Sequence, residues 1–232
     1  MKKVVMIGTA IAALVGGSAM AADMPLKGQR GPFYSWTGFY IGGHLGIAWA
    51  DIDWANVTLT GEPVSTSGSS WLAGGQAGFN YQIGSIVLGV EGTISGTDLS
   101  GSFRSKVNPV VTYTSEIDRI ATATGRFGLA WDRSLIYVKG GGAWANLTTS
   151  GLNPGLPDAF SIDSTRSGWV VGGGVEFLVT NNFVFGFEYS HIDLGTHNRT
   201  GTTTRAIPFT ISNIDTTIDT AVMRASWKFG WW

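Results

Sequence analysis

The sequence predicts an all-β fold, an eight-stranded antiparallel up-and-down transmembrane β-barrel with short periplasmic turns and long extracellular loops. Three observations lead to this prediction. Apolar and polar residues alternate with a period of two along most of the chain, which is the pattern of β-strands. Short turns and long polar segments follow these strands in alternation. Charged residues make up only 13% of the 232 residues and Gly accounts for 34, an unusual composition for a cytosolic domain.

The N-terminus predicts export from the cytoplasm. Two lysines and an apolar run over residues 4–15 precede a small-residue motif that ends at Ala21. This order of charge, apolar run and small residues is typical of a signal peptide, so we expect residues 1–21 to be removed after Ala21. The alternative is an uncleaved anchor helix. We expect residues 22–37 to form a flexible periplasmic leader and residues 38–232 to form the barrel.

The barrel is expected to be built from strands of about thirteen residues, more than the nine to eleven that a tilted strand needs to cross hydrocarbon. Tight turns are expected at 84–85, 132–133 and 181–182. Long polar loops are expected at 52–69, 99–114, 148–165 and 196–214. An even strand number with both termini on the short-turn side is typical of outer-membrane barrels. The expected strands are residues 38–51, 70–82, 86–98, 115–131, 134–147, 166–179, 183–195 and 215–229.

Each strand is assigned from its own alternation, in which one face is apolar and the other carries Gly, polar and charged residues. The apolar series also contain many aromatic side chains near the strand ends, as expected for rings at headgroup depth. The alternative is that they form the core of a soluble sandwich. In chain order the apolar series begin at Phe39, Trp71, Ile86, Phe127, Ile136, Trp169, Phe183 and Met223. The expected aromatic girdles are Trp49, Trp71, Trp144 and Trp169 toward the loops, and Phe39, Phe79, Tyr81, Trp131, Phe177, Phe183 and Trp227 toward the turns.

Six ionisable residues on the polar faces decide which face meets lipid. They lie at similar heights, because each is a similar distance along the chain from the nearest short turn or from the C-terminal end. Each would cost about 2–4 kcal/mol at the lipid midplane, whereas inside an eight-stranded barrel opposite charges can pair. We therefore expect a lumen plugged by a charge network rather than an open channel. The six are Glu91, Arg126, Lys139, Glu176, Glu188 and Arg224.

Three stretches of sequence resemble a known family. They are the opening Tyr34-Ser-Trp-Thr-Gly-Phe-Tyr-Ile-Gly-Gly43, the segment Glu188-Tyr-Ser-His-Ile-Asp-Leu-Gly195 and the close Arg224-Ala-Ser-Trp-Lys-Phe229. They are similar to the small outer-membrane surface proteins of alphaproteobacteria, porin-family members of the wider superfamily of OmpA-like eight-stranded transmembrane barrels. The resemblance covers nearly the whole mature chain. It implies an envelope protein that supports membrane integrity and host-facing surface properties, with no catalytic residue set.

One departure from this family lies at the C-terminus. Such barrels usually end on Phe, which the insertion machinery reads in the last strand, whereas this chain ends Phe229-Gly-Trp-Trp232. A terminal aromatic residue remains, and we expect weaker recognition of the last strand.

The best candidate for a ligand site is His191, Asp193 and His197, near the outer rim. Two imidazoles and a carboxylate are chemically able to bind a metal or a haem iron. Their spacing on a strand that leads into a loop does not bring them together, so rim solvation or lipopolysaccharide contact is the favoured interpretation. We expect no catalytic residues, no metal and no cofactor.

Three functions remain open from the sequence. The first is a structural barrel that supports the envelope, with outer-membrane lipid, lipopolysaccharide and the barrel-insertion machinery as partners. The second is a narrow porin-like channel for small solutes. The third is a surface receptor for haem or a host ligand, acting through the extracellular loops. A formal net charge of -1 argues against a nucleic-acid partner, and a closed wall with no free edge favours a monomer.

Overall fold

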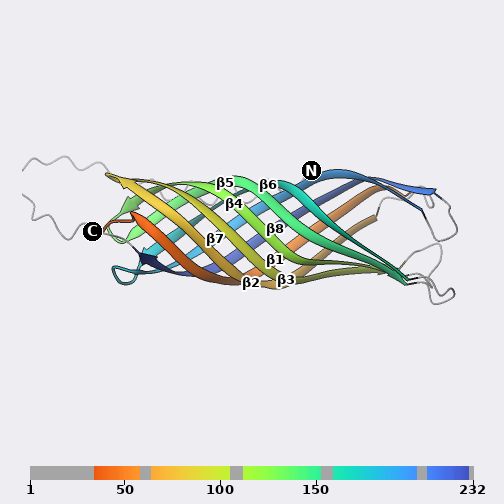
Figure 1. Ribbon diagram of the computed structural model, residues 1–232, viewed down its shortest axis with the longest axis horizontal. Helices are drawn as coiled ribbons and strands as arrows, with labels where there is room; N and C mark the ends of the chain where they lie inside the picture. The colour runs from red at the N-terminus through yellow and green to blue at the C-terminus, as the bar shows by residue number, and fades with distance from the viewer. Residues whose placement is uncertain (1–33, 58–63, 105–111, 153–158, 203–207, 230–232) are drawn as a thin grey trace, which may run out of the picture. The chain divides into compact units, whose positions relative to one another are not determined.

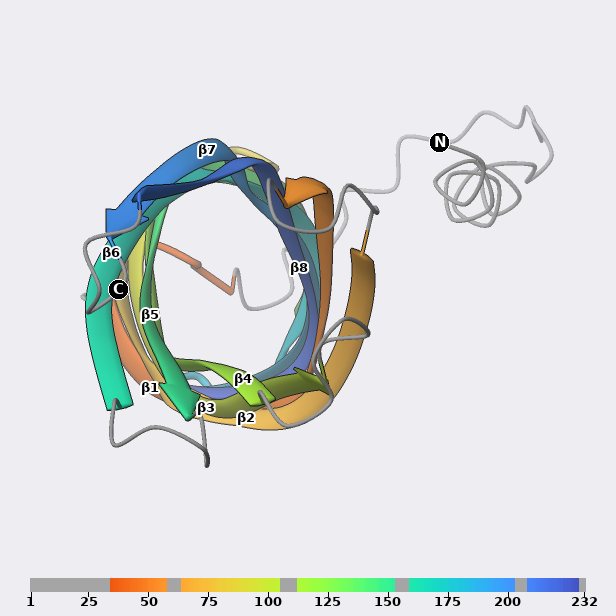
Figure 2. The same cartoon turned by 90° about the vertical axis from the view of Figure 1, so that its right-hand side faces the viewer.

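The computed structural model describes residues 34–57, 64–104, 112–152, 159–202 and 208–229, which form eight strands. Consecutive strands pair antiparallel, and β8 pairs with β1 to close the barrel, so the predicted fold class is confirmed. The strands run obliquely along the barrel (Figure 1) and form a ring in end view (Figure 2). The strands are β1 (Gly38–Val57), β2 (Val64–Ile83), β3 (Ile86–Arg104), β4 (Thr112–Trp131), β5 (Ser134–Leu152), β6 (Ala159–Leu178), β7 (Phe183–Thr202) and β8 (Pro208–Phe229).

The predicted signal peptide and residues 22–33 of the predicted leader lie outside the described residues. In the described part of the chain, no helix is long and apolar enough to cross a bilayer.

The strands are longer than the sequence predicts, because they continue into the segments expected to be loops. The β1–β2 ladder runs on to Trp54 and Val64, and the β5–β6 ladder runs on to Leu152 and Ala159. These extensions contain many Ser and Thr residues, and this polar composition is the reason why the sequence predicts loops there. Thr also has a high β propensity, and a strand that is polar on both faces remains stable where water reaches both faces. The wall therefore extends well beyond the length needed to cross hydrocarbon.

The short connections lie at one end of the barrel. Gly84 and Ser85 join β2 to β3, Asp132 and Arg133 join β4 to β5, and residues 179–182 join β6 to β7. Gly84 has φ 63° and Asp132 has φ 52°, which are the left-handed conformations that tight hairpins require.

The side chains alternate between two very different surfaces. The outer wall carries large apolar residues that are exposed, among them Phe39 at 66% and Trp71 at 62%. The facing positions point into the lumen and are buried, including charged residues such as Arg126 and Glu91. A protein surrounded by water would place these two sets the other way round. The outer wall therefore fits a lipid environment.

Glycines on the inner face make room for two buried tyrosines. A Cβ atom on Gly78 would lie against the Tyr40 ring and 2.6 Å from the Val90 carbonyl oxygen. A Cβ atom on Gly174 would lie 2.7 Å from the Tyr137 hydroxyl oxygen. The inner glycines thus allow an eight-stranded barrel, whose interior is just wide enough for side chains, to hold large ones.

We predict that Gly78→Ala lowers the free energy of unfolding by about 1–3 kcal/mol, because the added methyl group overpacks the lumen. The control is Gly92→Ala on the outer wall, where the added Cβ would lie 3.9 Å from the Thr122 carbonyl oxygen, an ordinary contact. Denaturant midpoints of the refolded barrel in micelles measure both effects. Equal midpoints for the two variants would contradict the tight inner packing.

Candidate functional site

The lumen is the candidate functional site, and it is filled by layers of side chains. Counted along each strand from the short-turn end, apolar residues come first, then charged residues, then small polar residues, and then a second apolar layer. We call these the inner apolar layer, the charged layer, the polar pocket and the outer apolar layer. Each is defined below by its residues.

The charged layer consists of the six ionisable residues named from the sequence: Glu91, Arg126, Lys139, Glu176, Glu188 and Arg224. The structure brings all six into one connected set of ion pairs, and each is at most 8% exposed. Three carboxylates face three cations, so the formal charges of the layer cancel. Cancellation matters because an unpaired charge in a dry interior costs several kcal/mol.

Glu91 on β3 is the centre of this network, because it reaches all three cations. Its carboxylate lies 3.4 Å from Arg126 Nη1 and 3.7 Å from Lys139 Nζ, and Arg224 donates to both of its oxygens. The Tyr40 hydroxyl also donates to Glu91 Oε2, over 2.8 Å. The Glu91 side chain has no exposed surface. A carboxylate this deeply buried is stable only because each of its oxygens has charged or polar donors.

Glu176 and Glu188 complete the pairing on the opposite wall. Arg126 Nη2 donates to Glu176 Oε1 over 2.8 Å, and Lys139 Nζ donates to Glu188 Oε1 over 2.6 Å. Arg224 bridges the two sides, since its Nη1 donates to Glu188 and its Nε lies 3.6 Å from Glu176. The network therefore ties β3, β4, β5, β6, β7 and β8 together across the lumen.

Two tyrosines belong to the network although the sequence analysis did not assign them to it. Tyr137 donates to Glu188 Oε2 over 2.6 Å, and the Arg126 guanidinium lies 3.9 Å from the centre of the Tyr137 ring. Tyr40 accepts a hydrogen bond from Arg126 over 2.6 Å. A signal was present in the sequence, since both tyrosines occupy the Gly-rich faces of their strands.

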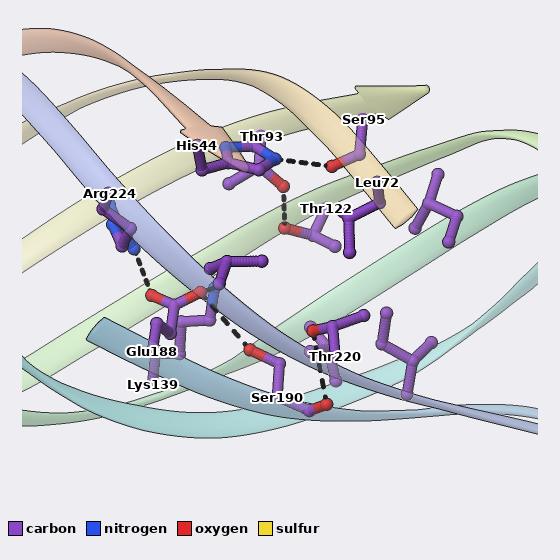
Figure 3. Close-up of a pocket in the computed structure, with 14 residues that line it drawn as sticks. His44, Leu72, Thr93, Ser95, Thr122, Lys139, Glu188, Ser190, Thr220 and Arg224 are labelled. Atoms are coloured by element: carbon purple, nitrogen blue, oxygen red, sulfur yellow. Dashed lines mark hydrogen bonds and ion pairs between the residues drawn. The ribbon is translucent and has the colours of Figure 1, made fainter. Parts of the chain in front are cut away.

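A small polar pocket lies between the charged layer and the loop end of the barrel (Figure 3). His44 contacts the Gln76 side chain over 2.6 Å and the Ser95 hydroxyl over 2.8 Å. The floor is formed by Lys139, Glu188 and Arg224. The cavity has a volume of about 30 Å³. A polar cavity of this size holds about two water molecules and is too small for a nutrient solute.

The outer apolar layer lies above this pocket, toward the loop end, and the sequence did not predict it. These side chains come from all eight strands and are at most 8% exposed. No side chain of this layer carries a polar atom that could replace the water around an ion. The layer consists of Ala48, Ala50, Leu72, Leu99, Ile120, Ala143, Ala145, Val170, Ile192, Leu194, Ile218 and Val222.

The inner apolar layer closes the short-turn end. It consists of Trp36, Val87, Leu135, Tyr137, Leu178 and Val184. Trp36 precedes the first strand, so this layer is completed by a residue that is not part of the wall.

At the proposed rim site, the structure describes the side chains of His191 and Asp193, and these two make separate contacts. His191 Nδ1 and Asp219 Oδ1 are 2.7 Å apart, and the Tyr189 hydroxyl donates to the same Asp219 oxygen. Asp193 instead accepts a hydrogen bond from the Gly195 backbone nitrogen. The His197 side chain lies outside what the structure describes. Within the described residues, no group of three or more His, Asp and Glu side chains is placed to hold a metal ion.

Comparisons with known proteins agree with this architecture. A family model described as outer membrane protein beta-barrel domain matches residues 9–229. The chain is 30% identical over 218 residues to a 31 kDa outer-membrane immunogenic protein of Brucella melitensis, covering 85% of this chain and 89% of the relative. It is 32% identical over 178 residues to a 22 kDa outer membrane protein of Rhizobium leguminosarum, covering 75% of this chain and 69% of the relative.

A solved structure shows the same fold. The crystal structure of the outer membrane protein OprG from Pseudomonas aeruginosa covers 84% of this chain and 97% of its own, with a TM-score of 0.50 and 11% sequence identity. At that identity the likeness shows the fold alone.

We predict that Arg224→Met lowers the free energy of unfolding by about 3–5 kcal/mol, because it leaves buried carboxylates without their shared cation. The matched control is Arg119→Met, since Arg119 is exposed on β4, and a change within about 0.5 kcal/mol is expected there. Urea unfolding in lipid vesicles, followed by tryptophan fluorescence, measures both. If Arg224→Met lowers the free energy of unfolding by less than about 1 kcal/mol, apolar packing can replace the ion pairs of Arg224.

Proposed function

Since the chain belongs to the outer-membrane β-barrel domain family and is an integral outer-membrane protein, we propose that it is a structural, non-enzymatic barrel with a plugged lumen. Its role is to stiffen the envelope and to present its loop end to the surroundings. This agrees with the alphaproteobacterial family that the sequence resembles, and the relatives confirm that assignment.

The single observation that carries this proposal is the packing of the lumen in successive layers. An ion entering from outside would meet the outer apolar layer first, then a network of fully paired charges, then the inner apolar layer. Each apolar layer opposes hydration, and each of the six charged side chains is already paired with an opposite charge. The arrangement supports a wall held rigid from within rather than a path for solutes.

The loop end is the part of the molecule that meets the surroundings. The strands extend well past the hydrocarbon, so their loop-side ends stand away from the membrane surface. Two sets of relatives are named outer-membrane immunogenic proteins. We propose the same kind of surface presentation for this chain, with lipopolysaccharide as the lipid partner of the outer rim and the insertion machinery as the partner of β8.

A narrow channel is the second candidate, and the polar pocket is the observation that favours it. The pocket adjoins Lys139 and Glu188, so a rearrangement of that pair would enlarge a space already lined by hydroxyl groups. Conduction would also require the outer apolar layer to part. A receptor for haem is less supported, because the His191 ring is already paired with Asp219.

We predict that the refolded protein gives no conductance steps in a planar bilayer, and that Lys139→Ala also remains silent. The expected silence follows from the two apolar layers, which Lys139→Ala leaves intact. An established porin in the same bilayer shows that steps would be detected. Stable steps from the wild-type protein, or ion selectivity that changes in Lys139→Ala, would favour the channel instead.

A further inference from the structure

The four residues before β1 lie inside the barrel mouth instead of leading away from it. These residues, 34–37, belong to the predicted flexible leader, yet they contact several strands. In Figure 2 the start of the described chain, coloured orange, lies within the ring of strands. We call residues 34–37 the N-terminal segment.

Gly38 turns the chain from the wall into the mouth. Its φ is 140°, a backbone conformation that residues with a side chain rarely adopt. Gly38 is also the first residue of β1 and pairs with Asn80 on β2. The change in direction therefore occurs at the junction between the fixed wall and the N-terminal segment.

Trp36 fills the lumen at this end. It is 1% exposed and packs in the inner apolar layer among residues of β3, β5, β6 and β7. Apart from Tyr137, the wall strands supply medium-sized apolar side chains here, such as Val87 and Leu135. The indole is thus the largest group in the layer, and it occupies the space between them.

Polar contacts fix the backbone on both sides of Trp36. Lys228 Nζ on β8 donates to the Ser35 carbonyl oxygen. The Trp36 backbone nitrogen donates to Gln82 Oε1 over 2.7 Å, and the Gln82 backbone nitrogen donates to Thr37 Oγ1 over 3.0 Å. These contacts hold the segment against β2 and β8, the two neighbours of β1.

A further contact shows that the segment spans the mouth. The Arg133 guanidinium lies 4.5 Å from the centre of the Tyr34 ring, and its Nη2 donates to the Tyr34 hydroxyl over 2.5 Å. Arg133 is in the turn between β4 and β5, and β5 is opposite β1 in a ring of eight strands. The segment therefore crosses from the β1 wall to the opposite wall, with Trp36 in between.

We propose that the N-terminal segment is a plug that closes the periplasmic mouth independently of the charged layer and the outer apolar layer. The chain turns into the mouth at Gly38, and Trp36 fills the space there. Lys228, Gln82 and Arg133 hold the segment in place, and we call them its clamps. This inference rests on the membrane barrel of the proposed function. It does not require the outer apolar layer to close the lumen.

Thiol labelling tests the proposal, because the chain contains no cysteine and any introduced one is a unique reporter. Val87→Cys places a thiol in the inner apolar layer, where Val87 is 2% exposed. We expect at least a tenfold faster reaction with a small water-soluble thiol reagent when Trp36→Ala is added. Lys228→Met, which removes one clamp and leaves Trp36 in place, is expected to give a smaller increase.

Leu72→Cys, in the outer apolar layer, is the matched control for general loosening. Its labelling is expected to stay slow in the Trp36→Ala background. If Val87→Cys is labelled at the same rate with and without Trp36→Ala, the proposal that this segment closes the mouth is wrong. Faster labelling of both reporters would overturn its independence and make Trp36 an ordinary core residue.

Conductance separates this inference from the proposed function. Trp36→Ala is expected to remain silent in a planar bilayer, since the outer apolar layer still closes the lumen. Steps in Trp36→Ala but not in the wild-type protein would refute the closed outer half of the proposed function and would support the plug.

Discussion

The pairing of three carboxylates with three cations in the buried lumen is the constraint on which the rest of the structure depends. Glu91 sits at its centre and contacts Arg126, Lys139 and Arg224. The charges decide which face of β3 to β8 points inward, and a shift of one residue in register would turn a charge toward lipid. They also set the height at which six strands must align. The glycines beside Tyr40 and Tyr137 then follow as the space that these long side chains need.

Much of this could be read from the sequence. The strand number, the short turns and all six charged residues of the network follow from period-two alternation and from the cost of charge in lipid. The sequence does not show which neutral residues join the charge network. Alternation places Tyr40 and Tyr137 on the Gly-rich faces of their strands, but it does not show which groups their hydroxyls meet. These partners, Glu91 for Tyr40 and Glu188 for Tyr137, depend on contacts across the lumen.

The outer apolar layer was missed for a related reason. Near the loop end of β6, Trp169, Val170 and Val171 are consecutive apolar residues, so the alternation that assigns faces is lost. Trp36 was missed because it lies outside any strand, in a segment whose Gly and Pro content predicts flexibility. Strand length was underestimated because Ser- and Thr-rich sequence suits both a loop and a strand that is wet on both faces. Each error concerns residues whose environment is decided by contacts distant in sequence.

The seam between β1 and β8 has a consequence for how the molecule forms. Phe39 pairs with Phe229, so the first and last strands of the wall meet edge to edge. Contacts between residues this far apart in the chain form slowly. Bringing the two ends together costs conformational entropy before any hydrogen bond between β1 and β8 can form. The barrel therefore cannot close until its final strand has been made and delivered. The contact between the N-terminal segment and Lys228 can form only afterwards, since Lys228 lies at that seam. The last clamp of the mouth is thus set only when the wall has closed.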